Sequence, residues 1–181
     1  MATIIERLKE TIIPTFIPAD QAYMTESIVV GRTPLTMHTE IICNKNQEYL
    51  LCQFDRQGLN NQLFPYFNPK VEGLVSMCDY ILFVEENTRL LVLLLELKHR
   101  NSPKRQLDIN ESFGLFICNR LRVLFEDFGK TPIIRKIGVK ESYNPMHSTQ
   151  DYRFGFDDEG FALLPNPHTL KLQMVSKVIS Q

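Results

Sequence analysis

One stretch decides the fold of this chain: LVSMCDYILFVEENTRLLVLLLELK, which covers residues 74–98. Leu74–Val84 and Arg89–Lys98 each have the composition of a strand, and the polar residues Glu85–Thr88 between them suit a turn. Every residue of Leu90–Leu95 is apolar. Such a run is typical of a strand buried on both faces, so we expect the second strand to lie in the middle of a sheet.

Folding this hairpin brings charged side chains together. A turn centred between positions 87 and 88 pairs residues whose numbers sum to 175, and 79 and 96 have that sum, so Asp79 lies opposite Glu96. Glu96 and Lys98 are separated by one residue, so their side chains emerge on the same face while Leu97 points into the core. Two carboxylates beside an ammonium suit Mg²⁺ or Mn²⁺ next to a reacting phosphate.

The spacing of these residues resembles a known motif. Asp79, sixteen intervening residues and Glu96-Leu97-Lys98 are similar to the signature of the PD-(D/E)xK nuclease superfamily. The resemblance covers Leu74–Val139, identifies no subfamily, and implies a restriction-endonuclease-like mixed sheet flanked by helices. It further implies hydrolysis of phosphodiester bonds in DNA or RNA with Mg²⁺ (or Mn²⁺). In that scheme Asp79, Glu96 and the backbone carbonyl of Leu97 bind the metal, and Lys98 positions the water.

Further residues are candidates through the same resemblance. Cys78 stands where the superfamily's name has a proline, which is a departure from the pattern. Many members add an acidic ligand from an earlier element, and Glu40 is favoured here over Glu6, Glu10 and Glu48. A basic cluster after the second strand could grip phosphate groups. A homodimer stays open, because many small nucleases dimerise to cut two strands. The predicted nucleic-acid-binding residues are Arg100, Lys104, Arg105 and Gln106, the last resembling an accessory glutamine.

Composition limits the class of protein. The chain has 181 residues, of which 44% are hydrophobic and 23% charged, which predicts one domain, 1–181, with a continuous core. The net charge is −1, so any attraction to nucleic acid must come from a local basic cluster. The four cysteines have no CxxC spacing and lie among apolar neighbours, which favours reduced core thiols. We find no signal peptide or membrane span and expect a soluble, cytoplasmic protein.

Hydrophobic periodicity predicts a mixed α/β (α+β) chain around the hairpin. An amphipathic helix should precede it, and a long helix with a following strand should succeed it. The predicted elements are a helix over Thr3–Ile13, two strands within Thr36–Phe54 joined at Asn44–Gln47, a helix from a Ser102 N-cap to Gly129, a strand over Thr131–Val139, and a late hairpin of Tyr152–Phe156 with Phe161–Leu164.

Other interpretations remain open from the sequence. Glu96 and Lys98 could be a solvated cross-strand pair at a sheet edge. The chain could be a catalytically silent nuclease-like module, or an unrelated α/β binding module whose partner meets the apolar surface near Phe64–Phe67. Aromatic residues in 64–67 and 152–156 are interpreted as core packing rather than base stacking. The remaining basic residues, Arg120, Arg122, Arg135, Lys136 and Lys140, are interpreted as exposed charge.

Overall fold

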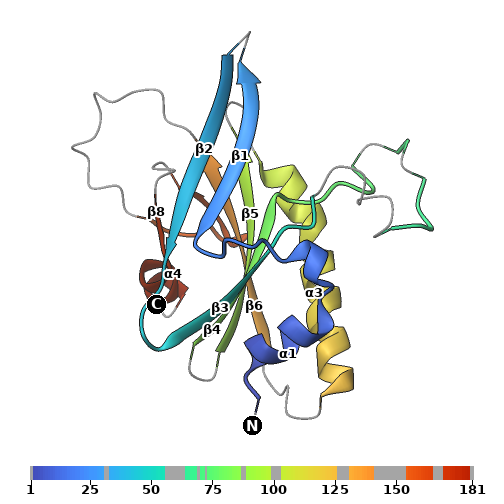
Figure 1. The fold of residues 1–181 in the computed structure, drawn as a ribbon, viewed down its shortest axis with the longest axis vertical. Helices are drawn as coiled ribbons and strands as arrows, with labels where there is room; N and C mark the ends of the chain where they lie inside the picture. The colour runs from blue at the N-terminus through green and yellow to red at the C-terminus, as the bar shows by residue number, and fades with distance from the viewer. Residues whose placement is uncertain are drawn as a thin grey trace.

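The computed structural model describes residues 2–30, 33–55, 64–68, 70–71, 73–86, 89–98, 103–125, 131–140, 154–164 and 169–179, without the side chains of 28–30, 33–35, 98 and 140. It has a mixed α and β fold, as predicted, with two sheets (Figure 1). The larger sheet has the strand order β3-β4-β5-β6-β7. Its strands are β3 (Gln47–Cys52), β4 (Tyr80–Glu86), β5 (Arg89–Lys98), β6 (Pro132–Lys140) and β7 (Phe161–Leu164).

The predicted central hairpin is confirmed by the register of β4 and β5. The strands are antiparallel, and the pair Tyr80 and Leu95 has the expected sum. The first strand is shorter than predicted, because residues 73–79 form no strand and β4 begins only at Tyr80. Asp79 therefore occupies the last position before the strand, where the chain enters the sheet.

Strand β5 stands in the middle of the larger sheet. It is antiparallel to β4 on one side and parallel to β6 on the other. The parallel pairing requires a crossover, which helix α3 (Lys104–Leu124) supplies. The register places Glu96 beside Gly138 of β6. The N-cap residue of α3 is Pro103, not Ser102, and the helix ends at Leu124; Ser102 and Gly129 lie outside the described residues.

Both faces of the larger sheet are covered, which explains the apolar run in β5. Helix α1 (Ile4–Thr11) and α3 pack on one face (Figure 1), where Leu90, Val92 and Leu94 join their core. The intervening residues, such as Leu91 and Leu93, face a second core on the other side. The second core is closed by the remaining elements: β1 (Tyr23–Val30), β2 (Thr33–Ile42), β8 (Thr169–Lys171) and α4 (Leu172–Ile179).

The smaller sheet, β1-β2-β8, is attached to the larger one through Tyr80. The Tyr80 hydroxyl accepts a hydrogen bond from the Thr25 amide at 3.0 Å and donates one to the Thr25 carbonyl at 2.8 Å. This pair of bonds ties β1 to the residue directly after Asp79. No helix of the described residues is long and apolar enough to span a membrane.

Two predicted pairings are wrong. Strands β2 and β3 exist, but they belong to different sheets, because β3 pairs with β4 and β2 with β1. The late hairpin is also absent from the described chain: residues 154–157 form no strand, and β7 pairs in parallel with β6. Tyr152 lies outside the described residues. Helix α1 is confirmed, and Thr3 and Glu6 cap it reciprocally.

Candidate functional site

Asp79 and Glu96 meet at one end of the central hairpin. The Asp79 amide donates a hydrogen bond to Glu96 Oε2 at 3.1 Å. In return, the Leu97 amide donates one to Asp79 Oδ2 at 2.6 Å. Each carboxylate thus accepts a hydrogen bond from the backbone at or beside the other, which fixes both side chains. The convergence predicted from the hairpin arithmetic is confirmed for these two residues.

Both carboxylates are buried. The exposed fraction is 0% for Glu96 and 7% for Asp79, so the alternative of a solvated pair is wrong for Glu96. Their charge acts on the neighbouring thiol: the pKa of Cys78 is raised well above its ordinary value by burial first, then by the charges of Glu96 and Asp79. The Cys78 thiol donates to the Tyr80 carbonyl at 3.4 Å and lies in the helix-side core.

Helix α3 covers this end of the hairpin. Glu96 follows Leu94 by two residues, so it faces the side of the sheet on which α3 packs. Gln106 Nε2 donates to the Met77 carbonyl at 2.5 Å. One turn later, Asn110 Nδ2 donates to the carbonyls of Ser76 (3.3 Å) and Gln106 (2.8 Å). The side-chain amides of Gln106 and Asn110 therefore hold residues 76–77, which lead into Asp79.

The predicted ligands and bases are placed as follows. Leu97 supplies a backbone contact to Asp79, while its side chain packs in the opposite core. Glu40 lies on β2 in the smaller sheet, between Tyr23 and Thr169. Among the described residues no group of three Asp, Glu, His or Cys side chains is placed to hold a metal ion. The role of Glu40 as a further ligand stays a prediction. The Lys98 side chain and all of Arg100 lie outside the described part, and their roles stay predictions.

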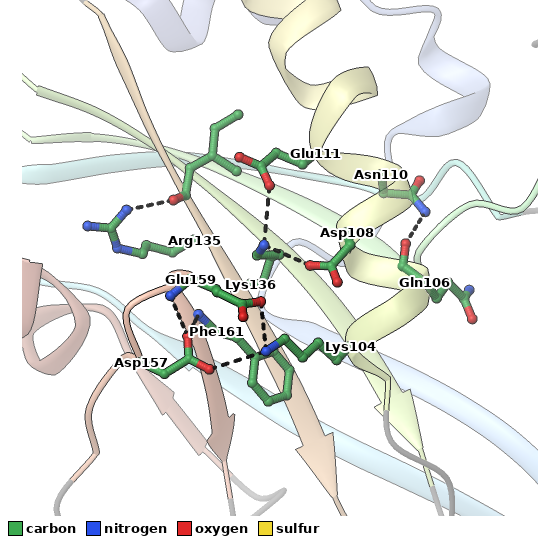
Figure 2. A network of polar contacts seen from close by, with 11 residues as sticks. Lys104, Gln106, Asp108, Asn110, Glu111, Arg135, Lys136, Asp157, Glu159 and Phe161 are labelled. Atoms are coloured by element: carbon green, nitrogen blue, oxygen red, sulfur yellow. Dashed lines mark hydrogen bonds and ion pairs between the residues drawn. The ribbon is translucent and has the colours of Figure 1, made fainter.

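The other basic candidates differ in their surroundings (Figure 2). Arg105 is exposed on the first turn of α3. Lys104 Nζ lies 2.8 Å from Glu159 Oε2 and 3.6 Å from Asp157 Oδ2, so acidic residues of the chain already surround it. Figure 2 also shows the amine of Lys136, which is directed at Asp108 and Glu111 of α3.

Lys136 was wrongly expected to be exposed. Its side chain is buried, and Nζ lies 2.8 Å from Asp108 Oδ1 and 3.2 Å from Glu111 Oε2. Burial lowers the pKa of Lys136, but the hydrogen bonds to the two carboxylates outweigh it and raise the pKa overall. These ion pairs fasten the first half of α3 to β6. Asp108 and Glu111 are three residues apart, so the sequence indicated that they share one face of the helix. Nothing in the sequence showed that this face is turned to β6.

Sequence reasoning also missed Asn110. It is buried on the face of α3 that otherwise carries apolar residues. A polar residue in the apolar stripe of a helix was the available signal. Its Nδ2 makes a polar contact with the Ser76 carbonyl inside an apolar core, while its Oδ1 atom is buried and has no hydrogen-bond partner.

The aromatic predictions are partly confirmed. Phe154 and Phe156 pack edge to face at 5.3 Å against the second core, and Phe64 packs against the first core. Tyr66 and Phe67 are exposed, so core packing is wrong for both. Cys43 is likewise exposed, whereas the other three free cysteines are buried as predicted.

Comparisons with protein-family models, with curated proteins and with solved structures each found no match.

Proposed function

We propose that this chain is a metal-dependent nuclease that hydrolyses phosphodiester bonds through Asp79, Glu96 and Lys98. The observation that carries the proposal is the reciprocal pair of hydrogen bonds between the two carboxylates and the backbone at Asp79 and Leu97. These bonds set two carboxylates side by side at the end of an apolar hairpin, on the face covered by α3. The arrangement agrees with what the resemblance to the PD-(D/E)xK superfamily implies.

Burial of the pair favours a functional role over a structural one. Removing a carboxylate from water is unfavourable by several kcal/mol unless charge and hydrogen bonds compensate it. An apolar residue at position 96 would continue the core of β5 without that cost. Closely spaced buried carboxylates are therefore more typical of sites that bind a cation or move a proton than of stabilising contacts.

The donor set fits a hard divalent cation. Carboxylate oxygens are the ligands preferred by Mg²⁺ and Mn²⁺, and Mg²⁺ is commonly bound through one or two carboxylates plus water and substrate phosphate. Asp79 and Glu96 would hold the ion, with the backbone carbonyl of Leu97 as the further ligand implied by the resemblance. When bound, such an ion lowers the pKa of a water and polarises the phosphate.

The remaining residues would bind and orient the substrate. Lys98, two residues after Glu96 on β5, is proposed to hold the attacking water. Gln106 fixes the approach to Asp79 through Met77, and Arg105 is exposed on the same first turn of α3. The amide groups at the N-terminus of a 21-residue helix favour an anion, as the phosphate of DNA or RNA is. The free thiols are consistent with a reducing compartment such as the cytoplasm.

Cleavage assays test this proposal. The parent protein would be incubated with single- and double-stranded DNA and RNA, with Mg²⁺, Mn²⁺ or EDTA. We expect cleavage of at least one substrate that EDTA abolishes. Asp79→Asn, Glu96→Gln and Lys98→Ala should each lower the rate at least 100-fold while the circular dichroism spectrum is unchanged.

Asp158→Asn provides the matched control, because Asp158 is an exposed carboxylate in the turn before β7. It should cleave like the parent. Absence of cleavage by the parent on all substrates, together with no metal-dependent shift of its melting temperature, would overturn the proposal in favour of a silent or unrelated binding module. Cleavage that persists in Asp79→Asn and Glu96→Gln would assign the activity to other residues or to a contaminant.

A further inference from the structure

Helix α3 packs on the central sheet through one face and exposes an apolar stripe on the opposite face. Ile109, Phe116 and Val123 follow one another at intervals of seven residues, so they lie on one face of the helix. Phe116 is 58% exposed and Val123 is 82% exposed. The opposite face of α3 is the one that packs on the sheet, so this stripe contributes nothing to the core of the chain.

The segment of the described residues 64–68, 70–71 and 73–74 extends the stripe. Phe64 packs edge to face on Phe113 of α3 at 5.6 Å, and the Cδ1 of Ile109 lies against Gly73. Nine of the fourteen exposed large apolar residues of the described chain belong to α3 or to this segment. We call them the α3 patch: Tyr66, Phe67, Val71, Leu74, Ile109, Leu115, Phe116, Val123 and Leu124.

The nine residues of the α3 patch together expose a large apolar area. Taking about 150–200 Å² as the full area of a large apolar residue, the exposed fractions of the nine give roughly 900 Å². A standard protein interface buries about 800 Å² on each partner. The patch alone therefore supplies the area that one side of a stable dimer needs.

We infer that the α3 patch is the interface of a homodimer in which two α3 helices pack antiparallel about a two-fold axis near Phe116. Ile109 and Val123 are equally far from Phe116 in the sequence, so an antiparallel copy sets Phe116 against its own counterpart and Ile109 against Val123. Such self-complementarity is what a two-fold interface requires.

Charge at the border of the stripe is self-complementary as well. Asp108 and Arg122 are fourteen residues apart, about four turns, so they lie on the same flank at opposite ends. An antiparallel copy brings Arg122 of one protomer beside Asp108 of the other. Arg122 is exposed, and the Asp108 carboxylate is 43% exposed while it pairs with Lys136.

A protein partner fits this surface better than nucleic acid does. Six of the nine patch residues are aliphatic and offer no ring for base stacking. Aliphatic and aromatic residues together are typical of the buried centre of an obligate interface. The inference is independent of the proposed nuclease activity, because the stripe lies on the face of α3 opposite the one that packs on the sheet of Asp79 and Glu96.

Mass measurement tests the dimer first. Sedimentation equilibrium or light scattering of the full chain should give twice the 21.1 kDa chain mass at micromolar concentration. Phe116→Glu and Val123→Glu should give the single-chain mass with an unchanged circular dichroism spectrum. Met174→Glu is the matched control, because Met174 is a large exposed apolar residue on α4, outside the patch, and this variant should remain dimeric. A monomeric parent, or a dimer that survives Phe116→Glu, would overturn the inference.

Cysteine cross-linking tests the two-fold geometry. In a Cys43→Ser background, which removes the exposed thiol, Phe116→Cys should form a disulfide-linked dimer on mild oxidation. Mixing Ile109→Cys with Val123→Cys should cross-link, whereas each alone should not. A parent that is monomeric and binds single-stranded oligonucleotide in a way that Phe116→Glu abolishes would instead assign the patch to nucleic acid.

Discussion

Gly138 is the position where a single methyl group should separate α3 from the sheet. It pairs with Glu96 in the register of β5 and β6. A Cβ at this position would overlap the Cγ of Pro103 and lie 3.0 Å from Leu163 Cδ2. Pro103 is the residue from which α3 begins, and its ring cannot rotate away, so the start of the helix must shift.

Overpacking of this kind is destabilising by about 1–3 kcal/mol. For a chain of this length each kcal/mol lowers the melting temperature by roughly 2–4 °C, so Gly138→Ala should melt about 2–12 °C below the parent. Two glycines give a graded control. A Cβ at Gly155 meets nothing within 4 Å, and one at Gly114 meets Val92 Cγ1 at 3.4 Å. Gly155→Ala should therefore leave the melting temperature nearly unchanged, with Gly114→Ala between the two.

Gly138→Ala should also affect the candidate metal site at Asp79 and Glu96. A displaced Pro103 moves the first turn of α3, from which Gln106 holds Met77 beside Asp79. Gly138→Ala should therefore weaken Mn²⁺ binding, while Gly155→Ala should not. If scanning calorimetry gives Gly138→Ala the same melting temperature as Gly155→Ala, the close contact between Pro103 at the start of α3 and Gly138 of β6 would be contradicted.

Three further outcomes are expected. Lys136→Met should lower the free energy of unfolding in urea by about 1–2 kcal/mol at pH 7, because two charged hydrogen bonds are lost, and Lys104→Met should have a smaller effect. Since the folded state raises the Lys136 pKa, the contribution of Lys136 to the free energy of unfolding is present at neutral pH and is lost as the pH rises through that raised pKa. If the parent and Lys136→Met lose stability identically at alkaline pH, this reasoning is contradicted. Tyr80→Phe should cost about 1–2 kcal/mol and speed hydrogen exchange at the Thr25 amide, and unchanged exchange there would argue against the link between the sheets. Among the four thiols only Cys43 should react quickly with a disulfide reagent at pH 8, because burial raises the pKa of the other three; fast reaction of a second thiol would contradict their burial.

The central hairpin was predictable because its information is local. The apolar run fixed β5, the polar turn fixed the register, and the register alone placed Asp79 opposite Glu96. The strand after the long helix was also predicted and is confirmed as β6, whereas its parallel pairing with β5 was not part of the prediction. In each case the deciding residues lie next to one another in the sequence.

The errors arose where pairing is decided by distant residues. Strand β3 has apolar residues on both faces, such as Leu50 and Leu51, and each face joins a different core. It therefore needs β4 as a neighbour, and the polar turn before it could not show that β2 belongs to the other sheet. Strand β8 pairs over only three residues with β2, too short a stretch for any periodicity to identify. The burial of Lys136 depends on two carboxylates across the helix, which only the folded chain displays.

Titration of the protein with Mn²⁺ by isothermal calorimetry, comparing the parent with Glu96→Gln, tests whether the paired carboxylates form a metal site. Gln keeps the size of the side chain and removes one negative ligand, so folding should be preserved. Saturable binding to the parent is expected, and it should be lost in Glu96→Gln and retained in the surface control Asp158→Asn. Binding that is equal in all three proteins, or absent from the parent, would contradict it.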